Sequence, residues 1–118
     1  MSDDYWSWRD RLAEANDARF WPIEAIDAMV IAGTAQFWCD GGAALVTKVT
    51  EYPGGAQALE AVAGAGAMGS LTQQIAADVE VWAREQGLTH LLIAGRKGWE
   101  RVHKDWRHHQ TILLKDLI

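Results

Sequence analysis

The stretch Ala61–Ser70, AVAGAGAMGS, places glycines at positions 64, 66 and 69 in the spacing G-x-G-x-x-G. A glycine-rich turn between a strand and a helix can seat a diphosphate, because unpaired backbone N–H groups and the helix dipole both favour negative charge. Small side chains also let a ligand approach the backbone closely. Since the spacing alone is a weak signal, the flanking sequence decides what kind of cradle it forms.

Three strands are predicted before the glycines, over residues 35–40, 43–52 and 56–63. The second strand is rich in β-branched residues, and its apolar side chains alternate onto one side. Asp40-Gly41-Gly42 and Pro53-Gly54-Gly55 are typical of the tight turns that join antiparallel strands. Together these features predict an antiparallel meander that leads into the glycines.

Two short helices are predicted ahead of the meander. The first has apolar residues at helical spacing and ends at Asn16–Asp17. The second begins with Pro22 as its first residue and is capped by Gly33. The expected apolar faces are Tyr5, Trp8, Leu12 and Ala15 in the first helix, and Ile23, Ile26 and Val30 in the second.

A third helix is predicted directly after the glycines, from Ser70 to Gln86, with Ser70 and Gln73 in a capping-box pattern. The apolar run 88–95 predicts a buried strand, which the helix crossover would place parallel to the strand before the glycines. A turn at 95–98, a short helix over 99–104 and a last strand over 111–118 would complete the chain.

The predicted order is ααβββαβαβ, in one domain that spans residues 1–118. This is an α/β (α+β) fold with a mixed, mostly antiparallel sheet of about five strands and about four helices. The order argues against a dinucleotide fold of repeating β-α-β units, because three antiparallel strands precede the glycines. The strand after the helix also ends in Ala94-Gly95-Arg96, without the acidic residue that would bind a ribose.

The composition limits the partners. A formal net charge of -5 over 118 residues disfavours binding to nucleic acid or to an anionic membrane. The acidic, aromatic N-terminus is unlike a signal or transit peptide, and the apolar runs are too short to span a bilayer, so a cytoplasmic location is expected. Cys39 is the single cysteine, and with no basic residue nearby it is interpreted as a packed thiol.

The seven tryptophans are expected mainly to fill the core. Trp6 and Trp8 are interpreted as exposed aromatic side chains that would allow a homodimer. No metal site is expected: His108 and His109 are adjacent, and adjacent residues on a strand point to opposite faces.

The order of elements and three local motifs resemble the GNAT (GCN5-related N-acetyltransferase) superfamily. Ala61–Gly66 is similar to the family's acetyl-CoA loop, Q/R-x-x-G-x-G/A, with alanine in place of Gln or Arg. WAREQGLTHLLIAG (82–95) resembles the passage that follows the family's long helix. GWERVHKDWRH (98–108) resembles the end of its fourth helix, with Trp106 in place of Phe.

The resemblance implies transfer of an acetyl group from acetyl-CoA to an amine on a small molecule or a protein, without a metal. The strands over 56–63 and 88–95 would splay apart, and the pantetheine arm would pair with the first of them. The residues expected to contact acetyl-CoA are Val62, Ala63, Gly64, Ala65, Gly66, Ala67, Met68, Gly69 and Ser70, together with Arg96 and Arg101.

Acetyl transfer needs a polarised thioester carbonyl and a base for the acceptor ammonium. A backbone N–H near Val62 or Ala63 would polarise the carbonyl. Glu60 is the candidate base, and Glu51 is held in reserve.

The leaving thiolate also needs a proton donor. The tyrosine that the family commonly uses falls at Arg101 here, so His103 and Tyr52 are the candidate donors. The basic run in the same region would either bind the phosphates of coenzyme A, form a solvated face, or contact an acidic partner. That run comprises Arg96, Lys97, Arg101, Lys104 and Arg107.

The stretches 36–66 and 79–102 also resemble small GNAT-like proteins encoded by tailed bacteriophages. This likeness implies a phage or prophage origin, and hence action in the host cytoplasm or in the virion. Two functions remain open. The first is an acetyl-CoA-dependent N-acetyltransferase, and the second is an inactive GNAT-like module that binds a virion or host protein.

Overall fold

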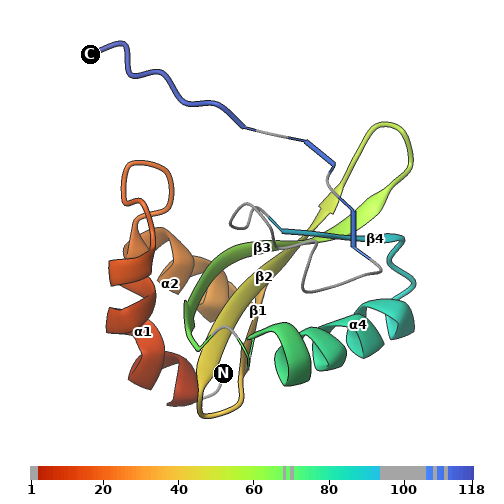
Figure 1. Cartoon of the computed structure of the whole chain (residues 1–118), viewed down its shortest axis with the longest axis horizontal. Coiled ribbons are helices and arrows are strands. Elements are labelled where there is room, and N and C mark those ends of the chain that lie inside the picture. The colour runs from red at the N-terminus through yellow and green to blue at the C-terminus, as the bar shows by residue number, and fades with distance from the viewer. Residues whose placement is uncertain (1–2, 68, 70, 94–105, 108, 111) are drawn as a thin grey trace.

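The structure is a computed structural model that describes residues 3–67, 69, 71–93, 106–107, 109–110 and 112–118. Helices α1 (Asp3–Ala15) and α2 (Ile23–Ala32) precede strands β1 (Ala35–Cys39), β2 (Ala43–Glu51) and β3 (Gln57–Gly66). A π-helical turn over Leu71–Ile75 leads into α4 (Ala76–Glu85), and β4 (His90–Leu92) follows. Figure 1 shows this arrangement, and it confirms the predicted α+β fold class.

The strands form one mixed sheet in the order β1-β2-β3-β4. The first three pair antiparallel, as the meander predicted, and β4 pairs parallel to β3 after the α4 crossover. Asp40 stabilises the turn before β2, because its Oδ1 accepts hydrogen bonds from the backbone N–H groups of Gly42 (2.9 Å) and Ala43 (3.1 Å). The Tyr52 N–H donates to the Ala56 carbonyl at 2.9 Å and closes the next turn.

The sheet is covered by α1 and α2 on one face and by α4 on the other (Figure 1). Side chains along β2 alternate between these two faces: Ala44 and Val46 pack under α1 and α2, whereas Ala43 and Leu45 pack toward α4. The two resulting cores hold the domain together from both sides of the sheet. Their fully buried large members are Tyr5, Leu12, Ile26 and Val46 on the first face, and Leu59 and Ile75 on the second.

A polar cluster of Tyr5, Arg9 and Asp27, which we call the helix clamp, fastens α1 to α2. The buried Tyr5 O–H donates to Asp27 Oδ1 at 2.6 Å, and Arg9 meets Asp27 Oδ2 with Nε at 2.9 Å and Nη2 at 2.7 Å. The hydrogen bond from Arg9 lowers the pKa of the Asp27 carboxyl. Burial, followed by the hydrogen bond to Asp27, raises the pKa of Tyr5. The phenol thus reaches the core with its O–H satisfied.

Glycines end the helices where the sequence predicted. Gly33 follows α2 with φ 76° and Gly87 follows α4 with φ 74°, both in the left-handed region that favours glycine. Pro22 is a correction to the predicted boundary. It lies just before α2 in an extended conformation, so α2 begins at Ile23.

Two predictions for the surface of α1 are wrong. Trp8 is only 7% exposed and belongs to the core, because it lies on the same helical face as Tyr5 and Leu12. Ala15, at the last turn of α1, is exposed. Trp6 is 44% exposed, as expected.

The prediction that the glycines form a turn is wrong for residues 64–66, which extend the strand predicted over 56–63. Residues 61–66 continue β3, because β2 offers backbone partners as far as the pair Ala43–Gly66. Gly66 has φ 106°, and a Cβ atom there would come within 2.5 Å of Ala43 Cα and of the Gly42 carbonyl oxygen. Only glycine fits at this crossing of two strands. β3 therefore ends at Gly66, only a few residues before the π-helical turn begins at Leu71.

The predicted last strand is wrong for the residues that the structure describes there. Residues 112–118 belong to no strand and extend away from the sheet (Figure 1). β4 is also shorter than the apolar run 88–95, so the sheet has four strands over the described ranges instead of about five. The predicted turn 95–98 and helix 99–104 lie outside the described residues.

None of the helices in the described part of the chain has both the length and the apolar character that crossing a membrane requires.

Candidate functional site

β3 has a neighbouring strand on both sides only along its first half. It pairs with β4 through Ala58–His90, Leu59–Leu91 and Glu60–Leu92, whereas its pairing with β2 continues to Gly66. Among the described residues, no strand pairs with residues 61–66 on the β4 side. Within the described ranges, the backbone N–H and C=O groups on that side of residues 61–66 therefore have no strand partner, and such an edge is the kind that can pair with an extended ligand. The pattern fits the splayed strands that the GNAT resemblance implies.

A β-bulge interrupts β3 at the start of residues 61–66, which pair with β2 but not with β4. We call these residues the unpaired half of β3. Thr47 lies opposite Ala61 and Val46 lies opposite Ala63, so Val62 is an extra residue without a partner in β2. A bulge redirects the local backbone groups and side chains and is common next to active sites. The sequence predicted a carbonyl-polarising N–H near Val62 or Ala63, and this is where the ladder is broken.

The described residues at the end of β3 and after it carry little side-chain bulk. A Cβ atom at Gly69 would meet nothing within 4 Å, whereas one at Gly64 would touch Leu45 Cδ1 at 3.4 Å. Ala65 and Ala67 add only methyl groups, so a ligand can come close to the backbone here. Gly66 serves the β2–β3 crossing instead. Met68 and Ser70, predicted to contact acetyl-CoA, lie outside the described residues.

Two candidate catalytic residues meet at the β2–β3 hairpin. The Tyr52 O–H donates a hydrogen bond to Glu60 Oε1, and the Thr50 hydroxyl donates to Glu60 Oε2 at 3.2 Å. The hydrogen bond to Glu60 is the main cause that raises the pKa of Tyr52. The phenol therefore stays protonated at neutral pH and lies directly beside the candidate base.

Lys48 is a member of this site that sequence reasoning missed. It lies opposite Glu60 in the β2–β3 register, and its Nζ is 3.8 Å from Glu60 Oε2. The same ammonium is 5.8 Å from the centre of the Trp21 ring, which comes from the α1–α2 loop. We call Lys48, Tyr52 and Glu60 the hairpin cluster. Counting residues outward from the Pro53–Gly55 turn would have paired Lys48 with Glu60.

The remaining candidates are not brought to the hairpin cluster. Glu51 lies one residue from Thr50 and therefore alternates onto the other face, where its carboxylate accepts a 3.5 Å hydrogen bond from Gln57 Nε2. Candidates that lie outside the described residues are Arg96, Lys97, Arg101, His103 and Lys104. Arg107 is described and exposed.

Neither the cysteine nor the histidines offer another reactive centre in the described ranges. Cys39 is half-buried under α1 and α2, and burial is the main cause that raises the pKa of its thiol, as expected for a packed side chain. No group of three or more metal-ligating side chains occurs among the described residues.

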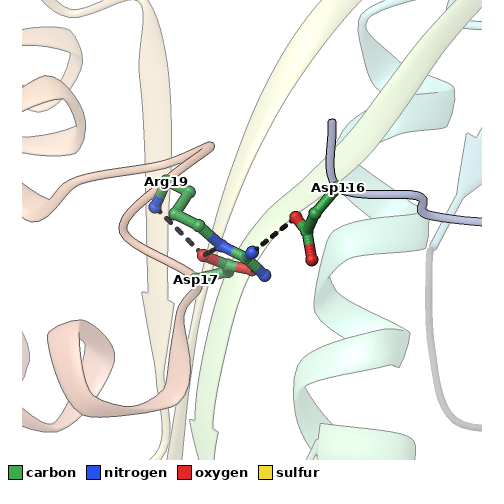
Figure 2. Close-up of polar contacts among 3 residues, drawn as sticks. All are labelled: Asp17, Arg19 and Asp116. Atoms are coloured by element: carbon green, nitrogen blue, oxygen red, sulfur yellow. Dashed lines mark hydrogen bonds and ion pairs between the residues drawn. The ribbon is translucent and has the colours of Figure 1, made fainter. Parts of the chain in front are cut away.

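An exposed ion-pair cluster links the α1–α2 loop to the C-terminal segment. Figure 2 shows Arg19 between two carboxylates: Nη2 is 2.8 Å from Asp17 Oδ2, and Nη1 is 2.9 Å from Asp116 Oδ1. The three side chains are 44–62% exposed, so solvent screens the attraction and each pair contributes little to stability.

Comparison with known proteins supports the fold but supplies no close relative. No family model matches the chain, and no curated protein matches it. Solved structures are similar over more than 90% of both chains at 15–17% identity, which is a likeness of fold.

An acetyltransferase of Trypanosoma brucei is 15% identical, with a TM-score of 0.61, over 97% of this chain and 93% of that one. A protein of Thermus thermophilus is 16% identical, with a TM-score of 0.58, over 94% and 92%. The ribosomal-protein-alanine N-acetyltransferase of Brucella melitensis is 16% identical, with a TM-score of 0.50, over 93% and 94%. The chain therefore shares the fold of these structures, which include two acetyltransferases.

Proposed function

We propose that this protein is an N-acetyltransferase that binds acetyl-CoA along the unpaired half of β3 and transfers the acetyl group to an amine. The observation that carries the proposal is the bulge at Val62, where β3 has just lost its β4 neighbour. An exposed strand edge can bind an extended amide-containing chain by backbone hydrogen bonds, and the pantetheine arm is such a chain.

The donor would lie against small residues. Val62, Ala63, Gly64 and Ala65 would face its pantetheine arm, and the backbone around Gly69 would face its diphosphate. When bound, acetyl-CoA supplies a thioester carbonyl that a bulge N–H can polarise. Arg96 and Arg101 remain proposed contacts to the phosphates.

The hairpin cluster would supply the proton chemistry. Glu60 is the proposed base for the acceptor ammonium, since its carboxylate lies two residues before the bulge on the face that carries the α1–α2 loop. Tyr52 would hold this carboxylate in place and offer the proton for the departing thiolate. His103 stays an alternative donor.

A second candidate function is a binding module without catalysis. Residues 112–118 expose five apolar side chains, including Leu113 at 89% and Leu117 at 85%, and such a segment is suited to cover a partner's surface. The resemblance to phage-encoded proteins would make that partner a virion or host protein, and the place of action the host cytoplasm.

Thermal melting with acetyl-CoA tests the proposal. A ligand that reaches 100 times its Kd stabilises by about 2.7 kcal/mol, which is roughly 10 °C in Tm for a domain of this size. Gly69→Glu should abolish the rise, because it places a carboxylate where the diphosphate would lie. Gly54→Glu, in the β2–β3 turn, is the matched control: a Cβ atom there also meets nothing within 4 Å.

The expected result is a rise in Tm for the wild type and for Gly54→Glu, and none for Gly69→Glu. No rise in the Tm of the wild type at millimolar acetyl-CoA would reject binding of the acetyl donor. The second candidate function, a binding module without catalysis, would then be favoured. An equal rise in Gly69→Glu would reject the assignment of the diphosphate to that backbone.

A further inference from the structure

Lys48 already has the surroundings that an acceptor amine would need. Its ammonium is 3.8 Å from the Glu60 carboxylate and 5.8 Å from the Trp21 ring centre, and its side chain is 32% exposed. A carboxylate that can take a proton and an aromatic face that can hold a cation are the two groups that would receive a substrate ammonium. In this protein the Lys48 side chain itself contacts both the carboxylate of Glu60 and the ring of Trp21.

Lys48 also lies close to where the acetyl group is proposed to be. Its register partner Glu60 is two residues from the Val62 bulge, which is about 7 Å along an extended strand. The lysine side chain is long and flexible, so its amine can cover that distance without a change in the backbone.

We propose that Lys48 is a self-acetylation site, an acceptor within the chain for the acetyl group of acetyl-CoA. This inference rests on the proposed acetyltransferase function and names the first amine that the site would meet. A merely structural cross-strand pair would put the same two charges opposite each other. It would not need the Trp21 ring beside the ammonium or the two hydroxyl groups, from Thr50 and Tyr52, on the carboxylate.

The reaction balances with groups that are present or named. Glu60 takes one proton from the Lys48 ammonium, and the free amine forms an amide bond with the acetyl carbon. The carbon–sulfur bond of the thioester breaks and its electron pair stays on sulfur. The nitrogen loses its second proton as the amide forms, and the thiolate takes up one proton to leave as coenzyme A. Glu60 then returns the proton it took to water. The product is neutral acetyl-lysine, so the ion pair with Glu60 is lost and the carboxylate is freed for another amine.

Peptide mass spectrometry of the full-length protein after incubation with acetyl-CoA at neutral pH tests this inference. Lys115 is an exposed internal control for non-enzymatic acetylation. We expect acetylation at Lys48 at least ~100-fold faster than at Lys115, and a ~100-fold loss at Lys48 in Glu60→Gln, with Lys115 unchanged. The rate at Lys48 should not depend on protein concentration, because donor and acceptor sites belong to one chain.

Equal rates at Lys48 and Lys115, or an unchanged Lys48 rate in Glu60→Gln, would overturn the inference. Thermal melting of the same samples separates its failure from that of the proposed function. If acetyl-CoA raises Tm while Lys48 stays unmodified, self-acetylation is rejected and donor binding stands. If Tm does not rise and Lys48 stays unmodified, both are rejected.

Discussion

The helix clamp and the hairpin cluster contain the same three kinds of side chain, a tyrosine, a carboxylate and a cation, but differ in how they are held. In the helix clamp the tyrosine is fully buried and a guanidinium grips the carboxylate through two nitrogens. In the hairpin cluster the tyrosine is 41% exposed and an ammonium approaches one oxygen at 3.8 Å. The two carboxylates are similarly exposed, Asp27 at 15% and Glu60 at 22%, so the clusters differ in the exposure of the tyrosine and in the kind of cation.

The buried phenol and the two-nitrogen contact are the features that set the helix clamp apart from the hairpin cluster. A planar guanidinium fixes a carboxylate in one orientation through its two nitrogens. A lysine binds as a single movable charge, and Lys48 approaches one oxygen of Glu60 only at 3.8 Å. Stability measurements should therefore respond strongly to the helix clamp and weakly to the hairpin cluster.

The largest expected effect is that of Asp27→Ala. It leaves the buried Tyr5 O–H and the Arg9 guanidinium without their shared acceptor, so we expect a loss of about 3 kcal/mol in the free energy of unfolding. Urea denaturation measures it. The matched change Glu60→Ala should cost less than about 1 kcal/mol, since Glu60 pairs with a partly exposed lysine. Equal losses would contradict the assignment of different roles.

A smaller effect is expected from removing each phenolic oxygen. Tyr5→Phe should cost about 1 kcal/mol, because it deletes a buried hydrogen bond while Asp27 keeps Arg9. Tyr52→Phe removes an exposed O–H and should change the unfolding midpoint less. The comparison fails if Tyr52→Phe proves the more destabilising of the two.

Acid should act on the helix clamp. The pKa of Asp27 is lowered in the folded state, so between the folded and unfolded values the unfolded chain binds more protons. This contribution to stability is present above the ordinary aspartate pKa of about 3.9 and is lost as pH falls through the folded value. Asp27→Asn should flatten the fall in stability below pH ~4. An unchanged acid slope in that variant would refute this prediction.

High pH should destabilise the fold through Tyr5, as low pH does through Asp27. Its pKa is raised, so its contribution is present below the ordinary tyrosine pKa of about 10 and is lost as pH rises toward the folded value. In an absorbance titration of tyrosinate, Tyr52 should ionise first, above its ordinary pKa, and Tyr5 only as the chain unfolds. Tyr52→Phe should remove the earlier step and leave the later one.

The smallest effect is expected from Lys48→Met. The substitution keeps an apolar stem against Trp21 and removes an ion pair of the kind that contributes about 0.5 kcal/mol. Chemical denaturation should place the variant within about 1 kcal/mol of the wild type. A larger loss in the free energy of unfolding would mean that Lys48, like the residues of the helix clamp, mainly stabilises the fold.

Local chemistry in the sequence was enough to predict most elements. The turn residues at 40–42 and 53–55, the glycines that follow α2 and α4, and the helical spacing of Tyr5, Trp8 and Leu12 each act over a few neighbours. They therefore predicted the order of helices and strands up to residue 93. The parallel β3–β4 pairing followed from the crossover rule.

Contacts between distant residues were the part that sequence patterns did not predict. The glycines at 64 and 66 resemble a turn in isolation, and only the register with β2 makes them part of a strand. The bond from Tyr5 to Asp27 spans 22 residues and depends on how α1 crosses α2. The apolar segment 112–118 has a strand-like pattern, but a pattern does not specify which sheet edge, if any, receives it.

The three-pair junction between β3 and β4 has a consequence for folding. The meander closes through short turns, whereas β4 must wait for α4 to form and bring it back across the sheet, which costs more loop entropy. We therefore expect β4 to dock last and to open first, so that native-state hydrogen exchange is faster at His90–Leu92 than in the middle of β2. The β2–β3 hairpin would then stay paired during each such local opening, while the β3–β4 edge is lost.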